Sequence, residues 1–485
     1  MSFSSSVFIL YFLPAALILY YLCWFSRPLQ NLVLLTASLV FYAFGQTTYF
    51  IILIFSVLWN WMVGMLIGMH RGRWRTVFLA AGCLVNLGVL LFFKQLPPFI
   101  NAVFAGWTPW APVPITPVSK LVPLGLSYYT LQACGYCVDV YRRTYGAEKN
   151  PLMIGLYLSF FPKMAAGPLI PYADMKEQLL CGGTLRRKFS PEEFSAGLCR
   201  FACGLAKIVL FGGSMARISD YVFIWSEMGQ ADINVPALLA WVGLLALSLK
   251  IYYQLSGYAD AAVGLGLMFG IRLPENFNYP FYSPSLTIFW QRWNITVLGW
   301  FREYAFPFLR QFNRRKGNMD MVILHLFFTW VLFAFWHGSG WTRFFWGALQ
   351  FLFLLVEHFF SYFGIPRDKW YMRVYTLVVV ILSFVFLRTV DLYQAGAFFR
   401  NLFGANHNGF FSAVAWVFVR ENWIWLAGGI LFCFPFWSGL RNRFQAKFAG
   451  WVPVSLALYP ILMAALLAVT LIFMSQDILV PFEYY

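Results

Sequence analysis

Long apolar segments recur along the whole chain, and they restrict its fold more than any other feature. A helix needs about 20 mostly apolar residues to cross a bilayer core. Ten runs are candidates for such spans: 7–25, 29–45, 49–69, 76–93, 235–251, 321–336, 344–363, 371–387, 423–437 and 452–473. Weaker runs lie near 152–170, 195–212 and 256–270, so the sequence predicts ten to thirteen hydrophobic helices.

The charge content agrees with a chain that is solvated mainly by lipid. Only 11% of the residues are charged and 61% are hydrophobic, whereas soluble domains average about 25% charged residues. No polar stretch is large enough for a separate soluble module. We therefore expect an all-α polytopic membrane protein with a single membrane domain, 1–485. Within it we expect peripheral helices in 1–115, a catalytic core in about 120–365 and C-terminal helices in 366–485.

The basic residues indicate topology rather than nucleic-acid binding. The net charge is +16, but the Lys and Arg residues form short clusters between apolar runs instead of one basic face. Such clusters mark cytoplasmic loops. The loop 70–75 carries Arg71, Arg73 and Arg75, and counting back three spans from it places the N-terminus on the opposite side of the membrane.

Polar side chains interrupt one hydrophobic region in particular. Gln254, Ser256, Tyr258 and Asp260 lie within nine residues of mainly apolar sequence, 252–260. Unpaired polar groups are costly in hydrocarbon, so these residues should face the protein interior or a water-filled cavity. We expect them to line the wall of a central site.

Histidines are few, and one of them has an unusual setting. His337 follows Trp336 in an aromatic run and precedes Gly338, whose lack of a side chain lets a substrate approach closely. A packing histidine that bonds a neighbouring carbonyl is the alternative. A metal site has no support, because His-Glu-x-x-His is absent and the CxxC pair Cys134 and Cys137 has no second pair.

A second polar group of residues precedes this histidine. It comprises Trp290, Arg292, Trp293 and Asn294. If the segment is one helix, Trp290, Trp293 and Asn294 share a face by their three- and four-residue spacing. Interfacial Trp residues and a snorkelling Arg would explain part of the pattern, but they explain Asn294 less well.

Several motifs resemble those of the membrane-bound O-acyltransferase (MBOAT) superfamily, in particular the membrane subunit of bacterial alginate O-acetylation systems. The similarity runs in collinear order from residue 3 to about 350. It is carried by the segments 123–129 (PLGLSYY), 161–168 (FPKMAAGP), 256–266 (SGYADAAVGLG), 274–277 (PENF), 289–293 (FWQRW) and 336–338 (WHG).

The resemblance implies a helical bundle around a funnel or tunnel, with His337 inside it as the catalytic base. It implies a bacterial inner-membrane location and acetyl transfer from a cytoplasmic donor, acetyl-CoA, with no permanently bound cofactor and no metal. The N-terminus would then be periplasmic. Implied partners are membrane lipid, a periplasmic SGNH-type acetyltransferase and glycan export machinery. The acceptor would be alginate, cellulose, peptidoglycan or another exopolysaccharide.

The chain departs from this pattern at one position. Alginate-type members usually carry His where this chain has Asn294, whereas many other members pair an Asn with the catalytic histidine. An amide can orient a carbonyl but cannot exchange a proton near neutral pH. Proton transfer therefore falls to His337, with Asn294 as orienting or oxyanion residue and Trp290, Arg292, Trp293 and Trp336 beside the substrate.

Other functions remain open on the sequence alone. A transporter or flippase also carries polar residues within the membrane, although no internal repeat is visible here. The D-alanyl transfer branch of the same superfamily and a scaffold without chemistry are further alternatives.

Overall fold

The computed structural model describes residues 2–44, 46–94, 122–180, 189–228, 235–305, 319–338, 340–362, 369–407, 409–436 and 452–475. Throughout these segments the regular structure is helical and contains no strand, which confirms the predicted all-α class. The chain divides into two compact units. Unit 1 comprises Met1–Leu198, Ala262–Pro274 and Gly299–Pro307, and unit 2 comprises Cys199–Ala261, Glu275–Leu298 and Phe308–Tyr485. The predicted division of a single domain at about 120 and 365 stays a prediction.

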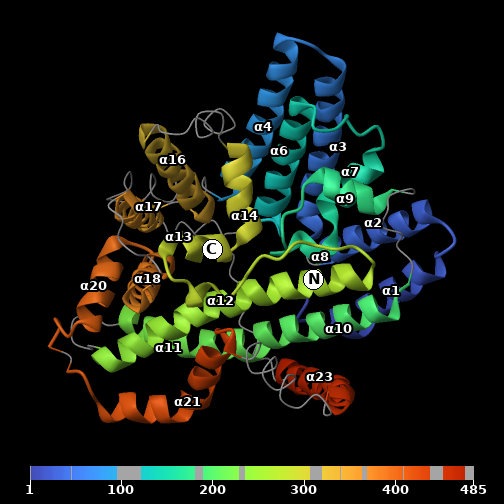
Figure 1. Cartoon of the computed structure of the whole chain (residues 1–485). Coiled ribbons are helices and arrows are strands. Elements are labelled where there is room, and N and C mark those ends of the chain that lie inside the picture. Colours follow the sequence, from blue (N-terminus) through green and yellow to red (C-terminus); the bar gives the residue numbers. More distant parts are fainter. Residues whose placement is uncertain are drawn as a thin grey trace, which may run out of the picture. The chain divides into compact units, whose positions relative to one another are not determined.

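Unit 1 is built mainly from the N-terminal helices (Figure 1). Its elements are η1 (Phe8–Phe12), α1 (Leu13–Leu22), α2 (Arg27–Ala43), α3 (Thr47–Met69), α4 (Arg73–Lys94), α6 (Leu126–Arg142), α7 (Pro151–Ser159), α8 (Phe161–Met164), α9 (Tyr172–Leu179) and η4 (Phe301–Ala305), with parts of α10 (Pro191–Ala206), α12 (Ala237–Met268) and α14 (Ile295–Trp300).

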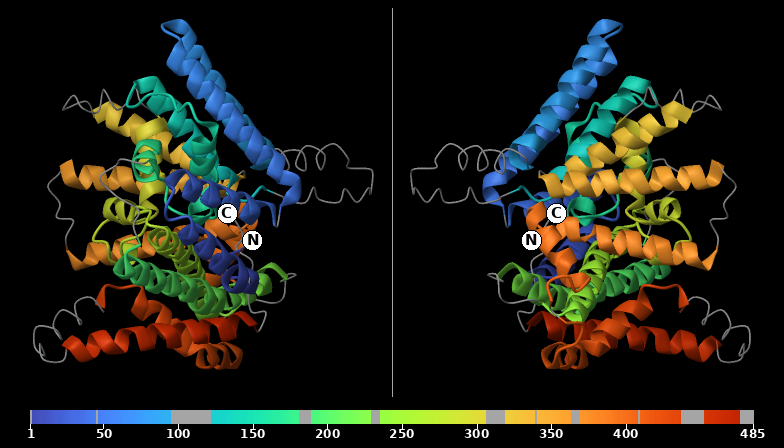
Figure 2. Two further views of the ribbon diagram at one scale, coloured as in Figure 1. Left: turned by 90° about the vertical axis from the view of Figure 1, so that its right-hand side faces the viewer. Right: turned by 90° about the vertical axis from the view of Figure 1, so that its left-hand side faces the viewer.

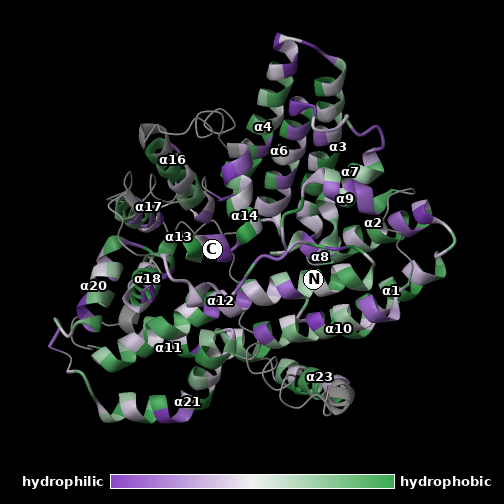
Figure 3. Ribbon diagram, viewed as in Figure 1, coloured by the Kyte–Doolittle hydropathy of each residue, from purple (hydrophilic) through white to green (hydrophobic). Residues whose placement is uncertain are grey.

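Helices α3 and α4 form a long antiparallel hairpin that packs against α6 (Figure 2). Two buried amides join the pair: Asn60 Nδ2 donates to Asn86 Oδ1 at 3.1 Å, and Asn86 Nδ2 donates to Asn60 Oδ1 at 2.7 Å. The chain turns at Gly72, whose φ of +65° favours glycine. The tip of the hairpin is hydrophilic (Figure 3), because the predicted cytoplasmic arginines lie there.

The weak apolar run at 152–170 is not one span. Helix α7 ends at Ser159, and Phe160 leaves the helical region with ψ +105° before the four-residue helix α8 begins. Pro162 explains the break, because its nitrogen cannot donate to the carbonyl four residues earlier. The break buries Lys163, whose Nζ donates to Gln132 Oε1 at 2.9 Å.

Unit 2 holds the helices that carry the predicted catalytic residues. Its elements are η2 (Lys207–Gly212), α11 (Gly213–Met228), η3 (Pro280–Tyr282), α13 (Leu286–Arg292), α16 (Met319–His337), α17 (Trp341–Tyr362), α18 (Trp370–Ser383), α19 (Val385–Arg388), α20 (Leu392–Leu402), α21 (Ala413–Phe432) and α23 (Val452–Ser475), with the remaining parts of α10, α12 and α14.

Helix α12 merges two runs that the sequence separates. The runs at 235–251 and 256–270 belong to one helix of 32 residues, which is about 48 Å long. The polar residues between them do not end the helix, because they are buried inside the protein rather than placed in lipid. Gln254, Ser256 and Tyr258 are each at most 5% exposed.

Six helices among the described residues are long and apolar enough to cross a membrane. They are Thr47–Met69, Arg73–Lys94, Pro191–Ile224, Ala237–Met268, Trp341–Phe360 and Trp370–Arg388, and shorter apolar helices occupy Phe8–Leu22, Ile323–His337 and Tyr459–Ser475. The chain is therefore polytopic, as predicted. The predicted total of ten to thirteen helices also involves residues outside the described segments.

Candidate active site

His337 is the last residue of α16, at the point where the helix stops. Gly338 follows with φ +142°, a backbone conformation that residues with side chains rarely adopt. Three aromatic rings surround the partly exposed imidazole, with centroids 4.8 Å (Phe333), 4.9 Å (Trp336) and 4.9 Å (Trp346) away. Each meets the imidazole at a steep angle of 70–86°.

These rings belong to a larger group that also includes Trp290 and Trp330. We call Trp290, Trp330, Phe333, Trp336, His337 and Trp346 the aromatic cluster. Trp290, from α13, packs its ring 4.8 Å from Trp330 and 5.9 Å from Trp346. Helix α17 approaches α16 closely because Gly347 has no side chain. A Cβ at this position would lie 2.6 Å from the Cβ of Ala334 in α16. The structure thus brings Trp290 and His337, 47 positions apart in sequence, into contact with the same indole.

The predicted helix through Trp290, Trp293 and Asn294 is wrong. Helix α13 ends at Arg292, Trp293 is extended, and Asn294 has a left-handed φ of +47°. Trp293 therefore packs away from the aromatic cluster, stacked on Phe289 at 5.4 Å and 22°. Asparagine tolerates the left-handed region better than most residues, so the chain can bend here before α14 begins.

Asn276 fixes this bend and orients Asn294. Its backbone oxygen accepts from the Ile295 nitrogen at 3.0 Å, and its Oδ1 accepts from the Thr296 nitrogen at 3.0 Å. A backbone N–H can only donate, so the other end of the Asn276 amide must be Nδ2, and it donates to Asn294 Oδ1 at 3.0 Å. The amide N–H groups of Asn294 then point elsewhere, and both side chains are buried.

A carboxylate from α17 holds the other end of α13. Glu357, fully buried, accepts from the Leu286 nitrogen at 2.5 Å, the Thr287 nitrogen at 2.9 Å and the Thr287 hydroxyl at 2.7 Å. Ser285 satisfies the next backbone donor, that of Ile288, at 3.2 Å. Seven residues before Glu357 on the same helix, Gln350 Oε1 accepts from Trp290 Nε1 at 3.0 Å. Helix α17 therefore positions both the start of α13 and the indole that α13 carries.

The predicted tunnel-lining residues of α12 contact residues of α10 and η2. Asp260 is an ion-pair residue: its carboxylate accepts from Arg200 at 2.6 Å and from Lys207 at 2.5 Å, and Arg200 also pairs with Glu275 at 2.6 Å. Gln254 packs against Gly212, and the Ser256 hydroxyl is buried without a hydrogen-bond partner among the described residues. The role of these residues and Tyr258 as tunnel lining stays a prediction, as does that of Arg292, whose carbonyl accepts from the Asn278 nitrogen at 3.0 Å.

Sequence reasoning gave no role to Asn276, Gln350 or Glu357. Asn276 lies within the PENF motif at 274–277. Its hydrogen-bond partners Asn294, Ile295 and Thr296 come later in the chain, and only the folded bend brings them to it. Gln350 and Glu357 are isolated polar residues in the apolar helix α17, and such residues often mark functional sites in membranes. That pattern could have drawn attention to them, although not to their partners.

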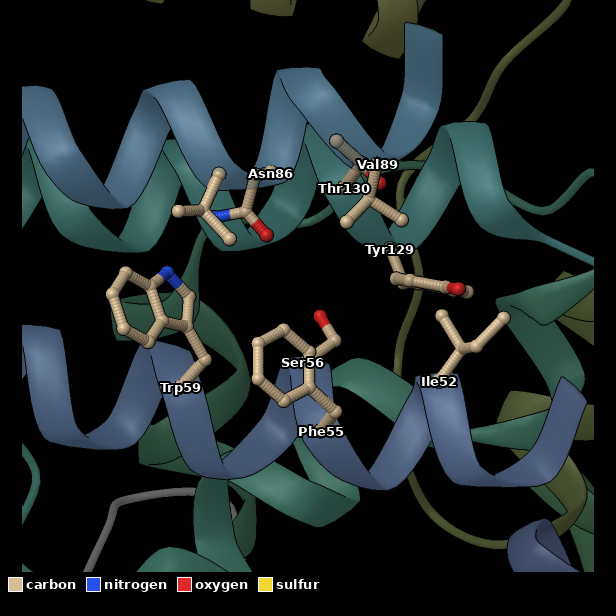
Figure 4. A pocket seen from close by; sticks show the side chains of 9 residues that line it. Ile52, Phe55, Ser56, Trp59, Asn86, Val89, Tyr129 and Thr130 are labelled. Atoms are coloured by element: carbon tan, nitrogen blue, oxygen red, sulfur yellow. The ribbon is translucent and has the colours of Figure 1, made fainter. Parts of the chain in front are cut away.

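No group of three or more His, Cys, Asp or Glu side chains is arranged to hold a metal ion in the part of the chain that the structure describes. A crevice in unit 1 lies between α3, α4 and α6 (Figure 4). Its polar lining includes Ser56, Asn86 and Thr130, and it contains none of the predicted catalytic residues.

Comparisons with known proteins agree on one family. Residues 149–390 match the model of MBOAT, the membrane-bound O-acyltransferase family. The chain is 32% identical to the probable alginate O-acetylase of Pseudomonas aeruginosa over 409 residues, which cover 83% of this chain and 75% of that protein. It is 28% identical to the peptidoglycan O-acetyltransferase of Helicobacter pylori, with 83% and 80% covered.

A more distant relative is the teichoic acid D-alanyltransferase of Bacillus subtilis, 24% identical with 67% of this chain and 80% of that protein covered. The motifs, the apolar helices and these similarities agree. The chain belongs to the membrane-bound O-acyltransferase family and is a multi-pass membrane O-acyltransferase.

Proposed function

We propose that the protein takes an acetyl group from acetyl-CoA on the cytoplasmic side of the bacterial inner membrane for O-acetylation of an exported glycan. The observation that carries this proposal is His337, at the end of α16 inside the aromatic cluster, in a chain whose relatives at 28–32% identity are named as O-acetylating enzymes. The D-alanyl alternative is less favoured because that relative is only 24% identical.

In the proposed step, the oxygen of an acceptor hydroxyl attacks the carbonyl carbon of the thioester. Neutral His337 removes the hydroxyl proton as the new C–O bond forms, and the carbonyl electron pair moves onto oxygen. When that pair returns, the C–S bond breaks, and the leaving thiolate takes the proton from His337. The products are an O-acetyl ester and free CoA thiol, so atoms and protons balance.

Asn294 supports this step as an orienting residue. Its Oδ1 accepts from Asn276 Nδ2, which orients the amide and leaves its N–H donors for a substrate. Such donors can hold the thioester carbonyl in the orientation that the attack requires. An amide has no proton to exchange near neutral pH, which leaves proton transfer to His337.

The proposed topology places the N-terminus in the periplasm and the hydrophilic tip of the α3–α4 hairpin in the cytoplasm. The arginines at that tip support it through the positive-inside rule. A periplasmic SGNH-type acetyltransferase and the glycan export machinery are the proposed protein partners. Alginate, cellulose, peptidoglycan and other exopolysaccharides are the candidate acceptors.

A deletion strain complemented with variants tests the proposal. His337→Ala should abolish O-acetylation of the envelope glycans, measured by mass spectrometry, while the protein remains at wild-type abundance in the membrane. His325→Ala is the matched control, because His325 lies on the same helix, twelve residues earlier. Acetyl content near the wild-type level in His337→Ala would refute the assignment.

A second measurement separates transfer from transport. Purified protein in lipid nanodiscs should release CoA thiol from acetyl-CoA when an acceptor is supplied, and His337→Ala should not. A transporter or flippase without transferase chemistry would release none in either form. The glycan that loses its acetyl groups in the deletion strain identifies the acceptor.

A further inference from the structure

Two buried N–H donors on α17 have no acceptor among the described residues. They are Nε1 of Trp346 and Nε2 of Gln350. Trp346 is 1% exposed and Gln350 is fully buried. Because the two residues are four positions apart on one helix, their side chains are neighbours on the same face.

The assignment of the Gln350 nitrogen follows from its partner. Trp290 Nε1–H can only donate, and it lies 3.0 Å from the Gln350 amide. The atom that faces it must therefore be the oxygen. The amide nitrogen, with two N–H bonds, is the atom that remains without an acceptor.

Packing alone does not account for this pair. Each buried donor without a partner costs about 1–3 kcal/mol, and buried polar groups in native proteins are almost always paired. One member of the pair lies beside the proposed base, since the Trp346 ring is 4.9 Å from the His337 ring, and Gln350 follows one helical turn later. Trp330 belongs to the same cluster, with its ring 5.8 Å from that of Trp346. Its indole nitrogen differs from that of Trp346, because it is not a buried donor that lacks a partner.

We propose that Trp346 and Gln350 bind the carbonyl oxygen of the acyl thioester and stabilise the oxyanion that forms there. This inference rests on the proposed acyl-transfer function. It assigns the developing negative charge to the donors on α17 and leaves Asn294 the task of orienting the substrate. Both donors are shielded from solvent, so the oxygen that meets them is inside the aromatic cluster, where such hydrogen bonds are strongest.

The stabilised species belongs to the same balanced step. As the acceptor oxygen bonds to the carbonyl carbon, the π pair moves to the carbonyl oxygen, and the two donors hold that charge. The bonds weaken again when the C–S bond breaks and the ester carbonyl forms. Removal of one such donor typically lowers kcat by about 10²–10³-fold.

The kinetic test compares two substitutions that remove the same atoms. Trp346→Phe should lower kcat for CoA release about 10²-fold, with the pH dependence of kcat/KM unchanged because His337 remains the base. Trp330→Phe is the matched control in the same cluster and should lower kcat far less. Gln350→Met should resemble Trp346→Phe.

A binding test addresses the carbonyl directly. The probes are acetyl-CoA and S-ethyl-CoA, in which a methylene replaces the carbonyl, added to the full-length protein in nanodiscs without acceptor. Wild-type protein and Trp330→Phe should prefer acetyl-CoA by up to about tenfold. Trp346→Phe and Gln350→Met should lose that preference.

Equal affinity of the wild-type protein for both probes, or no binding of either, would overturn the inference. So would equal losses of kcat in Trp346→Phe and Trp330→Phe. These results are separable from failure of the proposed function, because His337→Ala would still be inactive. Wild-type activity in His337→Ala would instead refute the function itself.

Discussion

Substitution of Glu357 should loosen the start of α13 in a graded way. Its carboxylate accepts from two backbone nitrogens, of Leu286 at 2.5 Å and Thr287 at 2.9 Å, and from the Thr287 hydroxyl at 2.7 Å. Glutamine keeps one accepting oxygen, so Glu357→Gln leaves one backbone donor without a partner, at a cost of about 1–3 kcal/mol. Alanine leaves both without a partner, so Glu357→Ala should cost about 2–6 kcal/mol.

Unfolding of the purified protein in detergent micelles gives the free energy of unfolding, and CoA release gives the activity. Both should fall in the order wild type, Glu357→Gln, Glu357→Ala, because α13 carries Trp290. Glu421→Gln makes the same chemical change at an exposed position of α21 and should leave both quantities unchanged. If both Glu357 variants stay within about 0.5 kcal/mol of wild type, the carboxylate does not hold α13 as we argue.

Three further outcomes are expected. Asn276→Ala should reduce kcat at least about tenfold with a smaller change in KM, because it frees the amide of Asn294 to rotate; unchanged kcat would show that this contact has no catalytic role. Asp260→Asn should destabilise the protein by about 1–3 kcal/mol, since it weakens two ion pairs, and should affect unfolding more than kcat; the reverse pattern would favour a tunnel-lining role. Burial raises the pKa of the Glu148 carboxyl, but the hydrogen bond from Lys176 and further hydrogen bonds outweigh this and hold it below the usual value. Its stabilising contribution is therefore present above the unfolded-state pKa of about 4.3 and is lost as the pH falls through the lower folded-state pKa. Unfolding measured against pH should show that acid-side loss in wild type, and Glu148→Gln should reduce it; identical acid profiles would contradict this.

The sequence predicted much of the fold because a lipid environment places only a few requirements on a chain that crosses it. Spans must be apolar over about 20 residues and helical throughout, so hydropathy alone indicated an all-α polytopic chain. It failed where a local feature changed the path of the backbone. Pro162 split the run at 152–170, and the buried polar stretch before Asp260 continued a helix that hydropathy had divided.

The candidate site was predicted less completely. The setting of His337 and the motif around it identified the proposed base from sequence. The shared helical face of Trp290, Trp293 and Asn294 was wrong, because an idealised helix does not anticipate a left-handed residue at Asn294. That conformation is stabilised by Asn276, a residue 18 positions away.

The sequence by itself determined that the chain is a membrane protein, that its helices are apolar, and which histidine is the candidate base. These properties depend on each segment and its solvent. Only the tertiary structure decided that the indole of Trp346 lies against that histidine, and that the amide of Gln350 and the carboxylate of Glu357, from the same helix α17, bind groups of α13. Hydrogen bonds act over about 3 Å, so these partners exist only once the folded backbone has brought α13, α16 and α17 together.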